Sequence, residues 1–244
     1  LGHSLWIDSA APVQSLLSLS KELGEIYRLQ LPGGQLLVVS SQRLVDELCD
    51  ESRFDKKVSG ALYNIRDIAL DGLFTAKTTE PNWQKAHNIL MPAFSMGSMS
   101  NYFPMMLEIA EQMMSRWSQL NAKDEIDVPA DMVRLTLDTI GLCGFDYRFN
   151  SFGREEPHPF IDSMLVALQE SIDRAVAIPM MHSLNVGRRQ RYEKHVENLK
   201  TIVDAVIAER KAGGGATDAK DLLSLMLTGA DPATGEKLSD ENIR

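Results

Sequence analysis

A tryptophan and a histidine four residues apart carry the most specific chemistry in this sequence. Trp83 and His87 lie in the segment Asn82–Met91, whose apolar spacing predicts a helix. Residues four apart share one helix face, so both side chains can direct N–H donors to the same place. Because the apolar loop Asp71–Thr75 comes just before them, the pair is typical of a site for an anionic group on an otherwise apolar ligand. The alternative is an ordinary core tryptophan and a surface histidine.

Other common catalytic and metal-binding motifs are absent from the sequence. No two of the five histidines have the i, i+4 spacing of a helical metal site, and there is no Cys-x-x-Cys. No Gly-x-x-x-x-Gly-Lys-Ser/Thr or Gly-x-Gly-x-x-Gly motif follows a strand, so nothing indicates a phosphate-binding or dinucleotide-binding loop. We therefore predict no metal ligand and no catalytic residue from the residue patterns alone.

Length and charge exclude several classes of protein. The 244 residues are 44% hydrophobic and 24% charged, which is enough chain for a sizeable core. The net charge of −9 argues against a nucleic-acid-binding protein, which normally presents a basic face. No run approaches the ~18 apolar residues of a membrane span, and the first residues do not resemble a signal peptide. Since the two cysteines also suit a reducing compartment, we expect a cytoplasmic location.

The elements that position these residues are mostly helices. Apolar spacing predicts a helix over Pro12–Leu23, and alternation predicts a β-hairpin over Ile26–Val39. Later helices are predicted over Asn82–Met91, Pro104–Leu120, Pro129–Cys143, Pro159–Val176, Gln190–Lys211 and Asp221–Leu227. Three of these begin at a proline, a common helix-start signal, and Ser239 is a candidate cap for one more helix. The predicted fold class is mainly α with a small β-hairpin near the N-terminus.

Several longer motifs resemble those of the cytochrome P450 family. They are CDESRFDK (Cys49–Lys56), DGLFT (Asp71–Thr75), NWQKAHNILMPAFS (Asn82–Ser95), RLTLDTIGLCGFDYRFNSF (Arg134–Phe152), PHPFIDSM (Pro157–Met164) and DPATGEKLSDENIR (Asp231–Arg244). The sequence is most similar to the N-terminal half of the haem domain in the self-sufficient fatty-acid hydroxylases of bacteria and fungi, which are fused to a flavin reductase. The resemblance implies a partial cytochrome P450 fold. Residues 1–244 would form part of one haem domain, whose C-terminal half lies outside this chain.

By this resemblance, several positions contact a cofactor or a substrate. Trp83, His87 and Lys56 would hold haem b through a propionate group. His87 replaces the arginine that is usual in the family, and an imidazole is a weaker, pH-dependent substitute. Phe74 would overhang the haem and control where oxygen is delivered to the substrate. The apolar substrate channel would be lined by Leu62, Ile65, Ala69, Phe74 and Leu168.

Two departures from the family pattern matter for function. Relatives hold the fatty-acid carboxylate with an arginine and a tyrosine, but the corresponding residues here are Gly34 and Val38. An alkyl chain would then bind by burial, worth about 0.8 kcal/mol per CH₂ group. The cysteine that ligates iron lies in the family's C-terminal half. Neither Cys49 nor Cys143 fits that position, and both are interpreted as small buried hydrophobic residues.

The resemblance therefore implies a fragment of a haem-thiolate monooxygenase that hydroxylates fatty acids or similar long-chain lipids with O₂. Electrons would come from NADPH through FAD and FMN in a flavin reductase, fused or separate, outside this chain. The isolated chain is expected to be inactive because it lacks the cysteine ligand. The alternative is a non-catalytic helical module or gene relic that binds an apolar ligand or a partner.

Overall fold

The computed structural model describes residues 2–8, 10–31, 34–176, 186–213 and 221–244. The first two residues of the predicted hairpin turn, Pro32 and Gly33, lie outside these ranges. The chain divides into two compact units, residues 1–56 and residues 57–244, and each is described by itself. The assignment of residues 1–244 to a single domain stays a prediction.

An antiparallel hairpin organises the first unit. Strand β1 (Ile26–Leu31) pairs with strand β2 (Gly34–Val39), as the alternating sequence predicts. Tyr27 of β1 is buried, and its hydroxyl donates a hydrogen bond of 2.8 Å to the carbonyl of Leu16. This bond attaches the hairpin to helix α1 (Pro12–Leu23). The other elements of the unit are the 3₁₀ turn η1 (Gly2–Trp6) and helix α2 (Gln42–Leu48).

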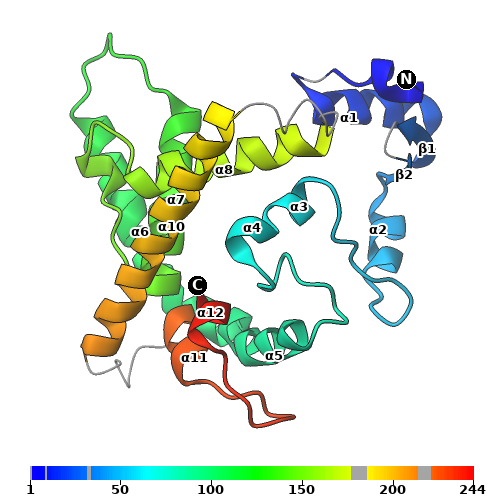
Figure 1. Ribbon diagram of the computed structural model, residues 1–244. Coiled ribbons are helices and arrows are strands. Elements are labelled where there is room, and N and C mark those ends of the chain that lie inside the picture. Colours follow the sequence, from blue (N-terminus) through cyan, green and yellow to red (C-terminus); the bar gives the residue numbers. More distant parts are fainter. Residues whose placement is uncertain (1, 9, 32–33, 177–185, 214–220) are drawn as a thin grey trace. The chain divides into compact units, whose positions relative to one another are not determined.

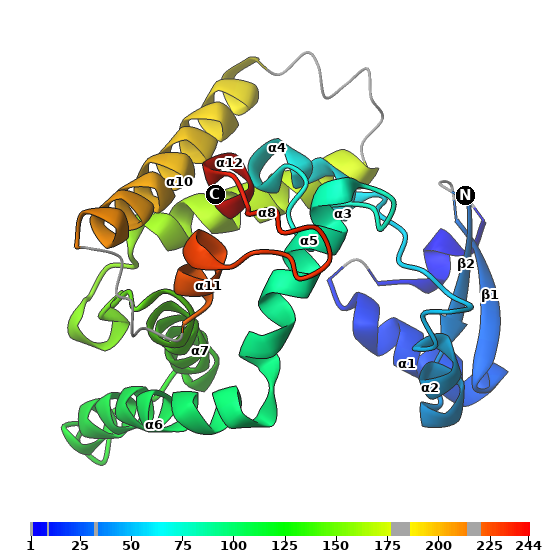
Figure 2. The ribbon, with the colours of Figure 1, turned by 90° about the horizontal axis from the view of Figure 1, so that it is seen from below.

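Helices form the second unit, so the predicted fold class is confirmed. They are α3 (Ala61–Asn64), α4 (Arg66–Ala69), α5 (Pro81–Leu90), α6 (Met96–Ser118), α7 (Val128–Phe145), α8 (Pro159–Val176), α10 (Val186–Ala212), α11 (Leu222–Thr228) and α12 (Asp240–Ile243), with 3₁₀ turns η2 (Met91–Phe94) and η3 (Ser151–Gly153). Figures 1 and 2 show α10 crossing α8, with which it is in contact, and α6 packs against α7. Helix α11 contacts both α5 and α7, which connects the two sides of the unit.

The predicted helix limits are confirmed for α8 and wrong for α6. Helix α8 has the predicted bounds, whereas Pro104 lies inside α6 rather than at its start. The helix begins eight residues earlier because the hydroxyl of Ser95 caps it, accepting a hydrogen bond of 3.2 Å from the N–H of Ser98. An interior proline removes one backbone hydrogen bond, and this helix of 23 residues tolerates that loss.

A buried carboxylate connects α8 to α10. Glu170 of α8 accepts hydrogen bonds from Arg174 at 3.1 Å and from Arg188 of α10 at 2.6 Å. Beside this pair lies a cluster of apolar side chains from α4, α8 and α10, with Ala167, Tyr192 and Leu199 buried at its centre. Among the described helices, none combines the length and the apolar run that a bilayer span requires.

Candidate functional site

Helix α5 carries the tryptophan and histidine that the sequence singled out. The rings of Trp83 and His87 stack with their centroids 5.0 Å apart and 21° between their planes, which confirms that they share a face. The Nδ1 atom of His87 is buried and makes no hydrogen bond with any described residue. A buried polar atom without a partner destabilises a protein by ~1–3 kcal/mol. This atom therefore fits a ligand that brings a hydrogen-bonding group.

The C-terminal segment of the chain fixes the orientation of α5. The buried residues Ala86 and Ile89 pack with Leu238 to form the main cluster of this region. Partly buried apolar side chains complete the cluster: Leu73, Met226 and Ile243. Asn88 adds a polar contact, since its side-chain amide donates to Asp231 at 2.8 Å. The Trp83–His87 pair is thus presented by a helix that is held by its other residues.

The loop before α5 exposes one aromatic ring on a braced backbone. Phe74 is 80% exposed, whereas the next residue, Thr75, is buried. Arg66 donates to the carbonyl of Thr75 at 2.7 Å and makes two hydrogen bonds of 2.8 Å to the carboxylate of Glu80. The hydrogen bond from Arg66 lowers the pKa of Glu80 to about 2. An exposed phenyl ring on a fixed loop is suited to contact an apolar ligand.

Three of the predicted channel residues line one apolar cavity. Ile65, Ala69 and Leu168 come together at a hollow of about 210 Å³ between α4, α8 and α10. The other lining residues are Ile68, Phe160, Met164, Ala167, Leu199, Lys200, Val203 and Arg244. Leu62 lies on the neighbouring helix α3 and is not one of the lining residues. No sequence motif marks Lys200, which reaches the cavity only because α10 packs against α8.

The remaining predicted contacts lie in the first unit. Lys56 is exposed and forms the end of that unit, while Gly34 and Val38 belong to β2. Their roles in binding stay predictions.

The two cysteines differ in burial. Cys143 is buried in α7 with its thiol 3.9 Å from the carbonyl of Tyr102, and burial raises the pKa of this thiol. Cys49 is exposed, so the prediction that it is buried was wrong. It follows the last residue of α2, a short helix whose Val45 and Leu48 are themselves exposed rather than buried. In the described part of the chain, no group of three or more His, Cys, Asp or Glu residues is arranged to hold a metal ion.

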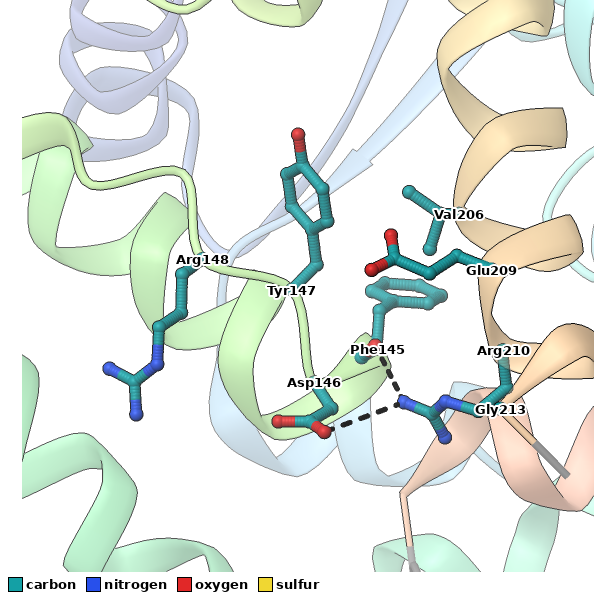
Figure 3. Close-up of a pocket in the computed structure, with 8 residues that line it drawn as sticks. All are labelled: Phe145, Asp146, Tyr147, Arg148, Val206, Glu209, Arg210 and Gly213. Carbon is teal, nitrogen blue, oxygen red and sulfur yellow. Dashed lines mark hydrogen bonds and ion pairs between the residues drawn. The ribbon is translucent and has the colours of Figure 1, made fainter. Parts of the chain in front are cut away.

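A second hollow, of about 480 Å³, lies between the end of α7 and α10 (Figure 3). Its central cation, Arg210, donates to Asp221 at 2.8 Å and to the carbonyl of Phe145 at 2.9 Å, and lies 3.9 Å from Asp146. Arg148 at its edge pairs with Glu108 at 2.5 Å. Because both arginines are neutralised by groups of the chain itself, this hollow offers little that a charged ligand could use.

Comparisons with known proteins agree with the resemblance. Residues 1–244 match the model of the cytochrome P450 family. The chain is 50% identical over 244 residues to the bifunctional cytochrome P450/NADPH–P450 reductase 1 of Bacillus subtilis (strain 168). It is 44% identical, also over 244 residues, to a self-sufficient cytochrome P450 monooxygenase of Phanerodontia chrysosporium. All of the chain, but only 23% of each relative's length, is covered.

This chain belongs to the cytochrome P450 family. Membership implies haem iron as the cofactor, and the residues of α5 fit a haem propionate. A carboxylate beside His87 would accept a hydrogen bond from the Nδ1 atom that otherwise has no partner. The stacked Trp83 ring packs against the imidazole and restricts its rotation.

Proposed function

We propose that this chain forms the propionate contact and part of the substrate channel of a haem-thiolate monooxygenase that hydroxylates fatty acids or similar long-chain lipids. The observation that carries the proposal is the buried, unpartnered Nδ1 of His87 stacked against Trp83. When bound, haem supplies the activation of O₂. A bifunctional cytochrome P450/NADPH–P450 reductase at 50% identity and a self-sufficient cytochrome P450 monooxygenase at 44% identity support this class of reaction.

In this proposal, the chain's own residues bind the haem propionates and orient the substrate. Trp83 and His87 hold one propionate carboxylate, and Lys56 adds a further contact to the propionates. The apolar walls at Ala69 and Leu168 bury the alkyl chain and exclude water, which contributes about 0.8 kcal/mol per CH₂ group. The exposed ring of Phe74 limits which carbon of the substrate can approach the reactive centre.

The electron supply and the iron ligand belong to the same proposal. NADPH, FAD and FMN act in a flavin reductase that is fused to the haem domain or separate from it. We place the cysteine ligand outside residues 1–244, since the thiol of Cys143 is buried with a raised pKa and Cys49 caps a surface helix. The proposed location of the protein is the cytoplasm.

Turnover by the haem-loaded protein that contains this chain tests the proposal. With NADPH and reductase, we expect hydroxylated dodecanoate, identified by mass spectrometry. Binding of dodecanoate without any product would instead support the non-catalytic module. The isolated 244-residue chain is expected to show neither turnover nor the red-shifted thiolate band of the reduced CO complex. That band in the isolated chain would contradict the placement of the cysteine ligand outside it.

A further inference from the structure

A lysine without an ion partner lines the apolar cavity between α4, α8 and α10. Lys200 lies on α10, is half-buried and contributes to the cavity wall. In the part of the chain that the structure describes, no carboxylate pairs with its ammonium group. A lysine can bury its alkyl stem along apolar walls while its charged end seeks water or an anion. Lys200 therefore leaves a positive charge available at the cavity.

One carboxylate that is a neighbour of Lys200 along α10 is already engaged. Asp204 is four residues further along α10, so it shares a helix face with Lys200. However, Arg244 donates to the Asp204 carboxylate at 2.6 Å. Arg244 also lines the cavity. Arg244 is thus paired with Asp204 and also lies near the carboxylates of Glu241 and Asp240, whereas Lys200 forms no ion pair with any described residue.

The walls of the cavity select the rest of the ligand. Nine of the eleven lining residues are apolar, and the exceptions are Lys200 and Arg244. The volume of about 210 Å³ is below the ~300–1,000 Å³ of a typical ligand pocket, so it holds a short apolar segment rather than a whole lipid. The complementary ligand is an alkyl chain that ends in an anion.

We propose that Lys200 binds the carboxylate of a fatty acid, whose first methylene groups lie in this cavity against Ala69 and Leu168. The proposal rests on the proposed lipid-hydroxylating function and names the residue that recognises the head group. It moves carboxylate recognition from the β-hairpin, where Gly34 and Val38 offer no charge, to helix α10. Helix α4 ends at Ala69 and leads into the loop that carries the exposed ring of Phe74.

Matched ligands and matched variants test the assignment. The affinities of dodecanoate and dodecanol are measured by calorimetry in the haem-loaded protein that contains this chain. Lys200→Met keeps the stem and removes the charge, and we expect dodecanoate affinity to fall on the order of tenfold. Dodecanol affinity is expected to stay within about twofold, since its neutral head group does not need the ammonium. Lys200→Arg is expected to keep most of the dodecanoate affinity.

Lys194→Met is the matched control, because Lys194 is an exposed lysine on the same helix that does not line the cavity. We expect this variant to bind both ligands like the unchanged protein. If Lys200→Met weakens both ligands equally, the residue is structural and the inference is wrong. If it weakens neither, the inference is wrong while the lipid site stands. If neither ligand binds the unchanged protein, the proposed function and this inference fail together.

Discussion

The face of α5 and the cavity beside α10 contain unmet interactions of two different kinds. At α5, a buried imidazole nitrogen lacks a hydrogen bond. At the cavity, a half-buried lysine lies among apolar walls, and no carboxylate of the described residues pairs with it. The first situation favours a polar group that enters a buried place, and the second favours an apolar ligand with a charged end. The comparison teaches that one unit of the chain offers two chemically different binding features through separate sets of residues.

The largest effect is expected from Trp83→Ala. Removing the indole takes away the ring that stacks on His87 and a large aromatic area, so haem retention is expected to fall at least tenfold. The measurement is the rate of haem transfer to apomyoglobin from the protein that contains this chain. Gln84→Ala is the control, because Gln84 is exposed on the same helix. Unchanged haem retention would place Trp83 away from the cofactor.

His87→Phe separates two effects of the unpartnered nitrogen, one on the unfolding free energy of the haem-free protein and one on haem retention. Phenylalanine keeps a stacking ring and removes the unpartnered nitrogen, so the haem-free protein is expected to gain ~1 kcal/mol in unfolding free energy. Haem retention is expected to fall severalfold, since the hydrogen bond to the propionate is lost. Chemical denaturation and haem transfer measure the two effects. A haem-free protein that loses stability would show that the nitrogen has a partner of its own.

Phe74→Ala tests the proposed role of the exposed ring in the loop before α5. The ring is 80% exposed, so its loss is expected to change the unfolding free energy by less than ~0.5 kcal/mol. The positions of hydroxylation on dodecanoate are expected to shift, because the pocket widens where substrate and cofactor meet. Leu73→Ala is the contrasting variant, since Leu73 packs against the Ala86–Ile89–Leu238 cluster and its truncation is expected to destabilise the fold. An identical product profile would separate Phe74 from the reactive centre.

The smallest effect is expected from the ion pair between Arg66 and Glu80, which holds the loop of Phe74. The pKa of Glu80 is about 2 in the folded protein and 4.5 without its partners, so its carboxylate stabilises the fold above the higher value. This contribution is lost progressively as the pH falls from 4.5 toward 2. Thermal unfolding of the unchanged protein and of Glu80→Gln is compared across that range. The difference between the two is expected to shrink with falling pH, and a constant difference would contradict the role of the Arg66–Glu80 pair.

The sequence predicted elements well where periodicity was long and poorly where it was short. The bounds of α8 and the shared face of Trp83 and His87 follow from 3.6-residue spacing, and both are confirmed. Helices α3 and α4 have four residues each, too few to show a period, and no prediction covered them. The start of α6 was predicted wrongly at Pro104, because proline is a common helix-start signal. The helix in fact begins after the N-cap residue Ser95.

The Trp83–His87 pair and the cavity at Lys200 also differ in how far the sequence predicts them. Trp83 and His87 are neighbours on one helix, so local spacing reveals them. Lys200 meets Leu168, and also Ala69 more than 100 residues away in the sequence, only after α10 has packed against α8. The Lys200 ammonium also stays unpaired with Asp204 because Arg244 donates a hydrogen bond to that carboxylate. No local sequence pattern indicates this contact. Tertiary packing, rather than propensity, creates this part of the site.

The unpartnered nitrogen of His87 also makes haem supply a determinant of how long the protein survives. A cofactor that binds only the folded form stabilises it by mass action, in proportion to the logarithm of the free cofactor concentration. The haem-free form contains a buried unsatisfied atom, and its unfolded population is correspondingly larger. We therefore expect cells short of haem to degrade this protein faster, so that its abundance follows cofactor availability even at constant synthesis.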